Sequence, residues 1–177
     1  MKIRAAEIVT LDGVMEACNQ WIFPYLDQEI EVDVINTLLE TDAFLFGRKT
    51  YLELTTWANR NSAMAELFNI LPKYVVSGTL KEVTWNNSHI ISGNIVEEVA
   101  KLKAQPGEYL LINGSADLVR LLAQHDLIDE YYLSIVPLVL GKGKRLFPEG
   151  DQAKLQLLDC KAYKTGLLHL SYGPIKQ

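Results

Sequence analysis

Apolar and polar positions follow two different periods along this chain. Short continuous apolar runs alternate, between residues 43 and 137, with segments whose apolar residues recur at the spacing of an amphipathic helix. Alternating strands and helices imply parallel crossover connections and helices on both faces of one sheet. The last pattern, residues 154–173, predicts an antiparallel hairpin that turns at Thr165–Gly166. We therefore predict a three-layer α/β fold around a mixed, mostly parallel sheet.

The same periods predict where the individual elements lie. Strands are expected at residues 3–11, 43–47, 73–78, 88–92, 108–114 and 129–141. Helices are expected at residues 28–41, from about Thr50, and at 63–71, 94–104 and 115–126, with Ser115 as the N-cap of the last helix. A chain of 177 residues suits a single domain over its whole length, 1–177.

Composition narrows the class of protein. Apolar residues make up 49 % of the chain and charged residues 22 %, and the net charge of −5 argues against binding to nucleic acid or acidic membranes. No apolar stretch approaches the ~20 residues of a membrane span, and the N-terminus lacks a signal-peptide core. Two isolated cysteines and three scattered histidines suggest no disulfide framework and no metal site: Cys18, Cys160, His89, His125 and His169. We expect a reduced, cytoplasmic protein.

Four of the predicted strand ends carry glycine or small hydroxyl residues, at positions 10–13, 47–51, 77–79 and 113–118. Ligands of such sheets bind outside the carboxyl ends of the strands. Arg48 and Lys49 stand in the first turn of a predicted helix, where cations are unfavourable unless an anion binds there. Each segment alone is equally well explained as an ordinary turn. Together they predict a site for a ligand with several phosphates.

Six segments carry a resemblance that covers nearly the whole chain: "TLDGVM" (10–15), "WIFPYLDQE" (21–29), "LFGRKTY" (45–51), "VVSGTL" (75–80), "INGSADLVRLL" (112–122) and "LIDEYYLSIVPLVLGKGKRLF" (127–147). In order and spacing they resemble the dihydrofolate reductase superfamily. They are most similar to its branch related to the C-terminal reductase domain of bifunctional riboflavin-biosynthesis deaminase-reductases. This resemblance implies a dihydrofolate reductase-like fold, NADPH as hydride donor (NADH is possible) and often a homodimer.

The resemblance also implies where the cofactor binds. Residues 47–50 would lie at its phosphates, 77–79 at the adenosine ribose, and 113–116 at the pyrophosphate. The implied cofactor-binding residues are Leu11, Gly13, Gly47, Arg48, Lys49, Thr50, Ser77, Gly78, Thr79, Asn113, Gly114, Ser115 and Ala116. Leu11, Asp12 and Gly13 would border the nicotinamide, and Pro137 and the Gly141–Gly143 loop would line the substrate side.

Reduction of a C=N or C=O bond needs a hydride donor and a source of a proton. Candidate acids near the expected pocket are Asp12, Glu16 and Asp27, and an ordered water is an equal alternative. Asp27 stands where superfamily folate reductases carry an acid, but it is also explained as the cap of the helix at 28–41. Three nearby aromatic residues would either stack on a flat heterocyclic substrate or cover the core: Trp21, Phe23 and Tyr25.

Two positions depart from the family pattern at the cofactor. Gly78 stands where the family often has an arginine that contacts the 2′-phosphate of NADPH, so Lys81 or Arg48 would have to replace it. The Asn113–Gly114 pair replaces the more usual Gly–Gly pair.

Two further departures concern the substrate. Ile112 and Ala6 occupy the places of an acid and a lysine in the riboflavin enzymes. We therefore expect an NAD(P)H-dependent reductase of a small pteridine- or pyrimidine-like heterocycle, resembling 5-amino-6-(5-phosphoribosylamino)uracil reductase in its chemistry more than in its substrate. A catalytically silent nucleotide-binding or sensor protein is the alternative, and a structural protein without a ligand is a third hypothesis.

Overall fold

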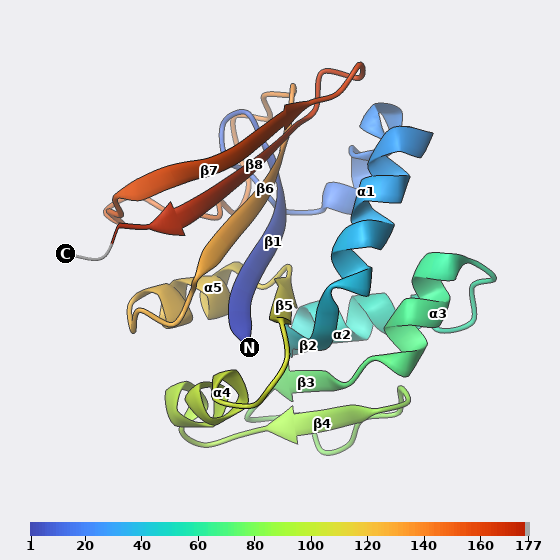
Figure 1. Ribbon diagram of the computed structural model, residues 1–177, viewed down its shortest axis with the longest axis vertical. Helices are drawn as coiled ribbons and strands as arrows, with labels where there is room; N and C mark the ends of the chain where they lie inside the picture. The colour runs from blue at the N-terminus through green and yellow to red at the C-terminus, as the bar shows by residue number, and fades with distance from the viewer. Residues whose placement is uncertain (176–177) are drawn as a thin grey trace.

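The computed structural model describes residues 1–175, which form an eight-stranded mixed sheet with helices on both faces (Figure 1). The strands lie in the order β4-β3-β2-β5-β1-β6-β8-β7. Neighbouring strands from β4 to β6 are parallel, and β8 runs antiparallel to both β6 and β7. The strands are β1 Lys2–Thr10, β2 Thr41–Gly47, β3 Lys73–Val76, β4 Ser88–Ile91, β5 Tyr109–Asn113, β6 Glu130–Val136, β7 Leu155–Ala162 and β8 Leu168–Pro174. The predicted three-layer fold class is confirmed.

The helices are α1 Gln28–Leu39, α2 Arg48–Leu54, α3 Ala63–Ile70, α4 Ile95–Lys103 and α5 Ala116–Ala123, with short 3-10 turns at Cys18–Gln20, Phe23–Tyr25 and Thr55–Trp57. Three helices begin after a residue whose side chain accepts a hydrogen bond from the first turn. These caps are Asp27, Ser62 and Asn94. Each cap satisfies one of the backbone N–H groups that a helix start leaves without a partner.

Side chains that alternate along the strands divide the core between two faces of the sheet. Ala43 and Leu45 of β2 contact the apolar cluster under α4 and α5. Phe44 and Phe46 of the same strand pack with α1, α2 and α3, where the Phe44 and Phe68 rings stack with centroids 4.5 Å apart. Figure 1 shows the same division, with α4 and α5 on one side and α1 and α3 on the other.

Two expectations from the sequence are wrong in detail. The strand expected at 129–141 ends at Val136, because Pro137 has no N–H to donate and the neighbouring strand β1 ends at Thr10, the partner of Val136. Ser115 precedes α5, but its side chain makes no capping bond. Its backbone is left-handed, with φ of 73°, and its hydroxyl group bonds to the turn after β2 instead.

A partly buried polar network, here called the hairpin clamp, joins α1 to the C-terminal hairpin through Asp33, Lys161, Tyr163 and His169. Asp33 Oδ2 accepts hydrogen bonds from Lys161 Nζ and from the Tyr163 hydroxyl, both at 2.5 Å. The Tyr163 hydroxyl lies 2.6 Å from His169 Nδ1. The clamp fixes the antiparallel end of the sheet against α1.

Candidate functional site

The turns that follow β2 and β5 interlock at the carboxyl edge of the sheet. The Ser115 hydroxyl accepts a hydrogen bond from the Gly47 backbone N–H at 2.8 Å and lies 2.8 Å from Thr50 Oγ1. A Cβ atom on Gly47 would lie 2.7 Å from Ser115 Oγ, which leaves no room for another residue there. We call Gly47, Thr50, Gly114 and Ser115 the strand-end cradle.

The second glycine of the cradle is required for two reasons. Gly114 has φ of +71°, and a Cβ atom there would lie 3.0 Å from Thr50 Cγ2 and Oγ1. Ser115, the next residue, also has a left-handed backbone conformation, which residues other than glycine adopt only at a cost in free energy. Two consecutive left-handed residues therefore shape the turn at the start of α5, and the start of a helix is a place where backbone N–H groups can bind phosphate.

Two cations stand at the mouth of the cradle. Arg48 and Lys49 form the first turn of α2, both are exposed, and neither forms an ion pair with any of residues 1–175. Cations at this end of a helix are unfavourable without an anion. The structure therefore keeps the two positive charges available for a ligand at the cradle.

The turn after β3 is closed by its own side chain. Ser77 is 6 % exposed, and its hydroxyl accepts hydrogen bonds from the Thr79 N–H at 3.2 Å and the Leu80 N–H at 2.9 Å. Gly78 and Thr79 are exposed, and a Cβ atom on Gly78 would meet nothing within 4 Å. Of the three residues expected at the adenosine ribose, Gly78 and Thr79 are open to a ligand.

Asp12 is occupied with backbone and hydroxyl donors rather than free. Its carboxylate accepts from the Thr10 hydroxyl at 2.5 Å and from the N–H groups of Leu140 at 3.2 Å and Gly141 at 2.8 Å. These hydrogen bonds, the one from Thr10 above all, lower the pKa of Asp12 to about 2. Asp12 thus joins the turn after β1 to Gly141, and it remains a carboxylate at neutral pH. Leu11, beside it, is 67 % exposed.

A pocket of about 320 Å³, the α1 pocket, opens between α1 and the start of α3. It is lined by Leu26, Asp27, Ile30, Glu31, Val34, Trp57, Ser62 and Met64. Asp27 borders it, although one of its oxygens, Oδ1, caps α1 by accepting from the Ile30 N–H at 2.9 Å. The sequence analysis missed Trp57 and Met64, because neither lies at a strand end and no local motif marks them.

The three aromatic residues expected at the substrate do not line this pocket. Trp21 and Tyr25 pack against the apolar cluster around Ile22 and Ile30, and Phe23 is 62 % exposed. The Trp21 indole donates to the Glu16 carbonyl at 3.0 Å. Pro137, expected on the substrate side, is also exposed and lies next to the Gly166 turn of the hairpin.

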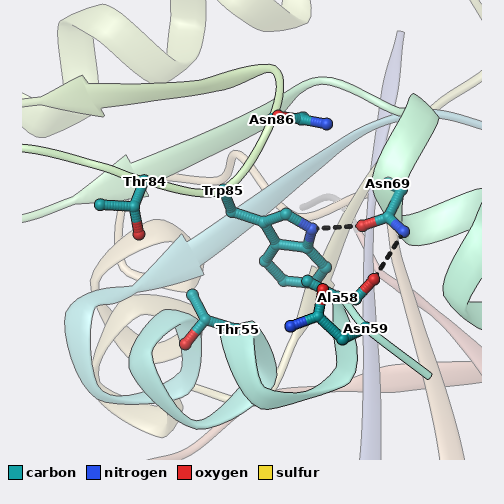
Figure 2. Close-up of a pocket in the computed structure, with 7 residues that line it drawn as sticks. All are labelled: Thr55, Ala58, Asn59, Asn69, Thr84, Trp85 and Asn86. Carbon is teal, nitrogen blue, oxygen red and sulfur yellow. Dashed lines mark hydrogen bonds between the residues drawn. The ribbon is translucent and has the colours of Figure 1, made fainter.

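A second pocket, of about 330 Å³, is lined by Trp85 and shares no lining residue with the α1 pocket (Figure 2). Its walls are Thr55, Ala58, Asn59, Asn69, Thr84, Trp85 and Asn86. The Trp85 indole donates to Asn69 Oδ1 at 2.5 Å, and the Asn69 amide donates to the Ala58 carbonyl at 2.9 Å, as the dashed lines in Figure 2 show. These polar groups satisfy one another, and no residue predicted for the site lies in this pocket.

One buried acid at the carboxyl edge was not predicted. Glu7 of β1 is 2 % exposed, and its Oε1 has no hydrogen-bond partner among residues 1–175. Burial raises the pKa of Glu7 well above its usual value, and the backbone N–H of Gly114 opposes that rise. The sequence signal was present: a charged residue interrupts the apolar run 3–11 at an inward position.

Two kinds of site are absent from the described part of the chain. Between residues 1 and 175, no helix has the length and apolar character needed to cross a membrane. The same residues contain no group of three or more His, Cys, Asp or Glu side chains placed to hold a metal ion.

The sheet order and the strand-end cradle define a protein with the dihydrofolate reductase fold. The dihydrofolate reductase of Enterococcus faecalis, solved with NADP(H), superposes with a TM-score of 0.68 at 12 % identity, over 99 % of this chain and 97 % of that one. The chain belongs to the RibD C-terminal domain family, which it matches over residues 1–169.

Two further relatives are similar over almost their whole length. A putative riboflavin biosynthesis protein from Shewanella sp. PV-4 has a TM-score of 0.81 at 20 % identity, over 99 % of this chain and 100 % of that one. The uncharacterized protein YyaP of Bacillus subtilis (strain 168) is 32 % identical over 171 residues, which is 93 % of this chain and 90 % of YyaP.

Proposed function

We propose that this protein is an NAD(P)H-dependent reductase that transfers hydride to a C=N or C=O bond of a small, flat heterocycle. The observation that carries the proposal is the strand-end cradle, beside which Arg48 and Lys49 form no ion pair with any of the described residues. Membership of the RibD C-terminal domain family supports it, as does a fold shared with a reductase solved with NADP(H).

The residues present fit a dinucleotide. Gly47 and Gly114 allow the turns after β2 and β5 to pack closely, because a Cβ atom on either would meet the side chain of Ser115 or Thr50. In this proposal, phosphate groups bind the backbone N–H groups at the start of α5. Arg48 and Lys49 would neutralise phosphate charge. Asn113 and Ala116 flank the cradle on the pyrophosphate side. Reduced nicotinamide supplies the hydride when bound, and this chain supplies position, shielding from water and a route for the proton.

The nicotinamide side of the proposed site is the turn after β1. Leu11 and Gly13 would border the ring, and the exposed Leu11 side chain would lose contact with water when the cofactor binds. Asp12 would act by holding Gly141 in place, because a carboxylate with a pKa of about 2 carries no proton to donate at neutral pH. The proton then comes from Asp27, beside the α1 pocket, or from an ordered water.

The α1 pocket is the proposed substrate site, and its walls are mainly apolar. Ile112 is fully buried in the core, and Ala6 packs against the cluster beside α1. Neither offers a polar partner for a phosphoribosyl group. A compact pteridine- or pyrimidine-like ring between apolar walls fits this chain better than a phosphoribosylated pyrimidine.

A catalytically silent nucleotide-binding or sensor protein is the second candidate, and the same two residues, Ile112 and Ala6, favour it. Both candidates bind the cofactor, and only the reductase oxidises it. Consumption of NADPH in the presence of a dihydropterin or a quinonoid pyrimidine separates the two, measured as loss of absorbance of the reduced nicotinamide.

The proposal includes a homodimer formed through β7. This strand is the edge of the sheet, paired on one side by β8, and its Leu157 and Leu158 are 52 % and 56 % exposed. An exposed apolar edge is a surface that another chain can cover. Sedimentation at micromolar concentration is expected to give a dimer, and Leu158→Lys a monomer. A wild-type monomer contradicts this part of the proposal.

Calorimetric titration with NADPH and NADH tests the cofactor assignment. Arg48→Ala is expected to weaken NADPH binding at least about tenfold, because a charge-assisted hydrogen bond contributes roughly 1.5–3 kcal/mol. Lys154→Ala removes an exposed cation before β7 and is the matched control, with no change expected. Absence of binding by either cofactor to the folded wild-type protein overturns the proposed function.

A further inference from the structure

Glu7 interrupts an otherwise apolar row in the centre of the sheet. Its side chain points to the same face of β1 as Ile3, Ala5 and Val9, which belong to the core under α4 and α5. The residue paired with Glu7 on the neighbouring strand β6 is Leu133, another core residue. A carboxyl group in this row is costly, because it loses water without gaining a cation.

The groups that face Glu7 leave its charge uncompensated. Ala6 of β1 pairs with Asn113 of β5, so the next residue of each segment, Glu7 and Gly114, lie side by side. The Gly114 amide favours the ionised form of Glu7, and Oε1 has no hydrogen-bond partner among residues 1–175. The thiol of Cys18 is a titratable group that senses Glu7: burial raises its pKa first, and Glu7 and Glu53 raise it further. No cation of the described chain contributes to the shift in the pKa of Glu7.

The charged residues at the start of α5 do not compensate it either. Asp117 is 86 % exposed at its side chain and pairs with Lys144, and Arg120 pairs with Asp151 at the surface. The residues of α5 nearest the cradle, Ser115 and Ala116, carry no charge. The carboxyl of Glu7 is therefore a buried acidic group that interacts with the backbone of Gly114 in the cradle.

We propose that Glu7 is a positioning residue of the nucleotide site, that it acts through the Gly114 amide, and that phosphate groups bind the cradle preferentially when Glu7 carries a proton. A carboxylate behind Gly114 opposes the charge of phosphates in front of it, whereas a carboxylic acid holds the same amide without that repulsion. Binding and protonation are then linked, so each favours the other. This inference rests on the proposed cofactor site.

The linkage has a definite sign. Because burial raises the pKa of Glu7 well above its usual value, the free protein holds this proton to a higher pH than an exposed carboxyl group would, and loses it as pH rises. Phosphate binding raises the pKa further, so the protein takes up a proton on binding above the pKa of free Glu7. Between the pKa values of the free and bound states, the Kd is expected to rise by up to about tenfold per pH unit.

Calorimetry with NADPH at pH 6.5, 7.5 and 8.5, in buffers of different ionisation enthalpy, counts the protons taken up. Wild-type protein is expected to take up as much as one more proton per NADPH than Glu7→Gln, and Glu7→Gln is expected to bind more tightly at pH 8.5. Glu53→Gln removes the other carboxylate near Cys18 and should behave as wild type. Protons bound by the 2′-phosphate of NADPH are common to all three proteins and cancel in the comparison.

Equal proton uptake by wild type and Glu7→Gln overturns the role of Glu7 while leaving the cofactor site intact. Absence of NADPH binding at every pH in all three proteins instead removes the proposed function itself. A second measurement needs no variant: carbon NMR of the Glu7 carboxyl in wild-type protein should show its pKa rise when NADH saturates the site. An unchanged pKa with NADH bound overturns the inference.

Discussion

A carboxyl group lies beside the strand-end cradle and another lies in the hairpin clamp, and their surroundings shift the two pKa values in opposite directions. Asp33 of the clamp accepts from Lys161 and from Tyr163, and these partners hold its pKa below the usual value. Among residues 1–175, Glu7 has no cationic partner and its Oε1 has no hydrogen-bond partner, and burial raises its pKa.

The difference separates a structural region from a ligand-binding region. In the clamp, the polar groups satisfy each other, so the network holds α1 against the hairpin without help. At the strand ends, within residues 1–175, one oxygen of a buried acid has no hydrogen-bond partner and two exposed cations form no ion pair. Proteins retain such local conflicts where a ligand resolves them. Mutations in the clamp should therefore change stability, and mutations at the strand ends should change binding.

The largest expected effect is the acid sensitivity of the clamp. Burial lowers the pKa of His169 to about 4 from 6.5, so the folded protein keeps this ring neutral while the unfolded chain binds a proton. The unfolded state gains protons as pH falls from 6.5 to 4, and the contribution of His169 to stability falls with it, by about 3 kcal/mol. Urea unfolding at pH 7.5 and pH 4 measures the loss.

The control is a second histidine. His125→Gln alters an exposed ring after α5 and should keep the wild-type loss, whereas His169→Gln should lose most of it. If His169→Gln lost as much unfolding free energy between pH 7.5 and pH 4 as the wild type does, the clamp would not be the source of the acid sensitivity.

Asp33→Ala comes next. It removes the carboxylate that accepts from the buried Tyr163 hydroxyl and from Lys161, so we expect a loss of about 2 kcal/mol in the free energy of unfolding. Glu29→Ala is the matched control, because Glu29 is half exposed and pairs with the same lysine at 3.1 Å. Equal losses in both variants would show that the ion pairs of Lys161, and not the hydrogen bond of the buried Tyr163 hydroxyl, contribute most of the stability of the clamp.

Glu7→Gln should change the free energy of unfolding by less than Asp33→Ala does, and it should stabilise the protein where Asp33→Ala destabilises it. Because the folded-state pKa of Glu7 is raised, the folded protein binds more protons than the unfolded chain, and the stability that depends on this proton is lost as pH rises. Glu7→Gln should therefore be more stable than wild type at pH 9, by about 1 kcal/mol, and no more stable at pH 5. A difference independent of pH would show that Glu7 does not titrate in the folded protein.

The same contrast explains what could be predicted from the sequence. The clusters under the helices and the caps at Asp27 and Asn94 follow from local periods and short-range bonds. The positions of Gly47 and Gly114 follow from the rule that ligands bind at the carboxyl ends of strands.

The remaining features depend on register between distant segments. The position of Glu7 beside Gly114 depends on the pairing of β1 with β5, which no local sequence pattern predicts. The sequence offered Asp12 as a candidate acid, but it could not predict that the backbone N–H of distant Gly141 donates a hydrogen bond to this carboxylate. The hydroxyl of Ser115 bonds to Gly47 rather than to its own helix, because a left-handed turn directs it there.

Gly78→Arg should leave stability unchanged within about 0.5 kcal/mol, because the position is exposed and a Cβ atom there meets nothing within 4 Å. A guanidinium beside the proposed adenosine ribose should raise the preference for NADPH over NADH about tenfold through charge-assisted bonds to the 2′-phosphate. Gly78→Gln, an uncharged side chain, controls for added bulk and should change the ratio little. The ratio of the two Kd values, measured by calorimetry, isolates the effect, since both cofactors share every other group. Equal strengthening of both cofactors by the arginine would place the ribose away from this turn, and the cation would then act on the pyrophosphate instead.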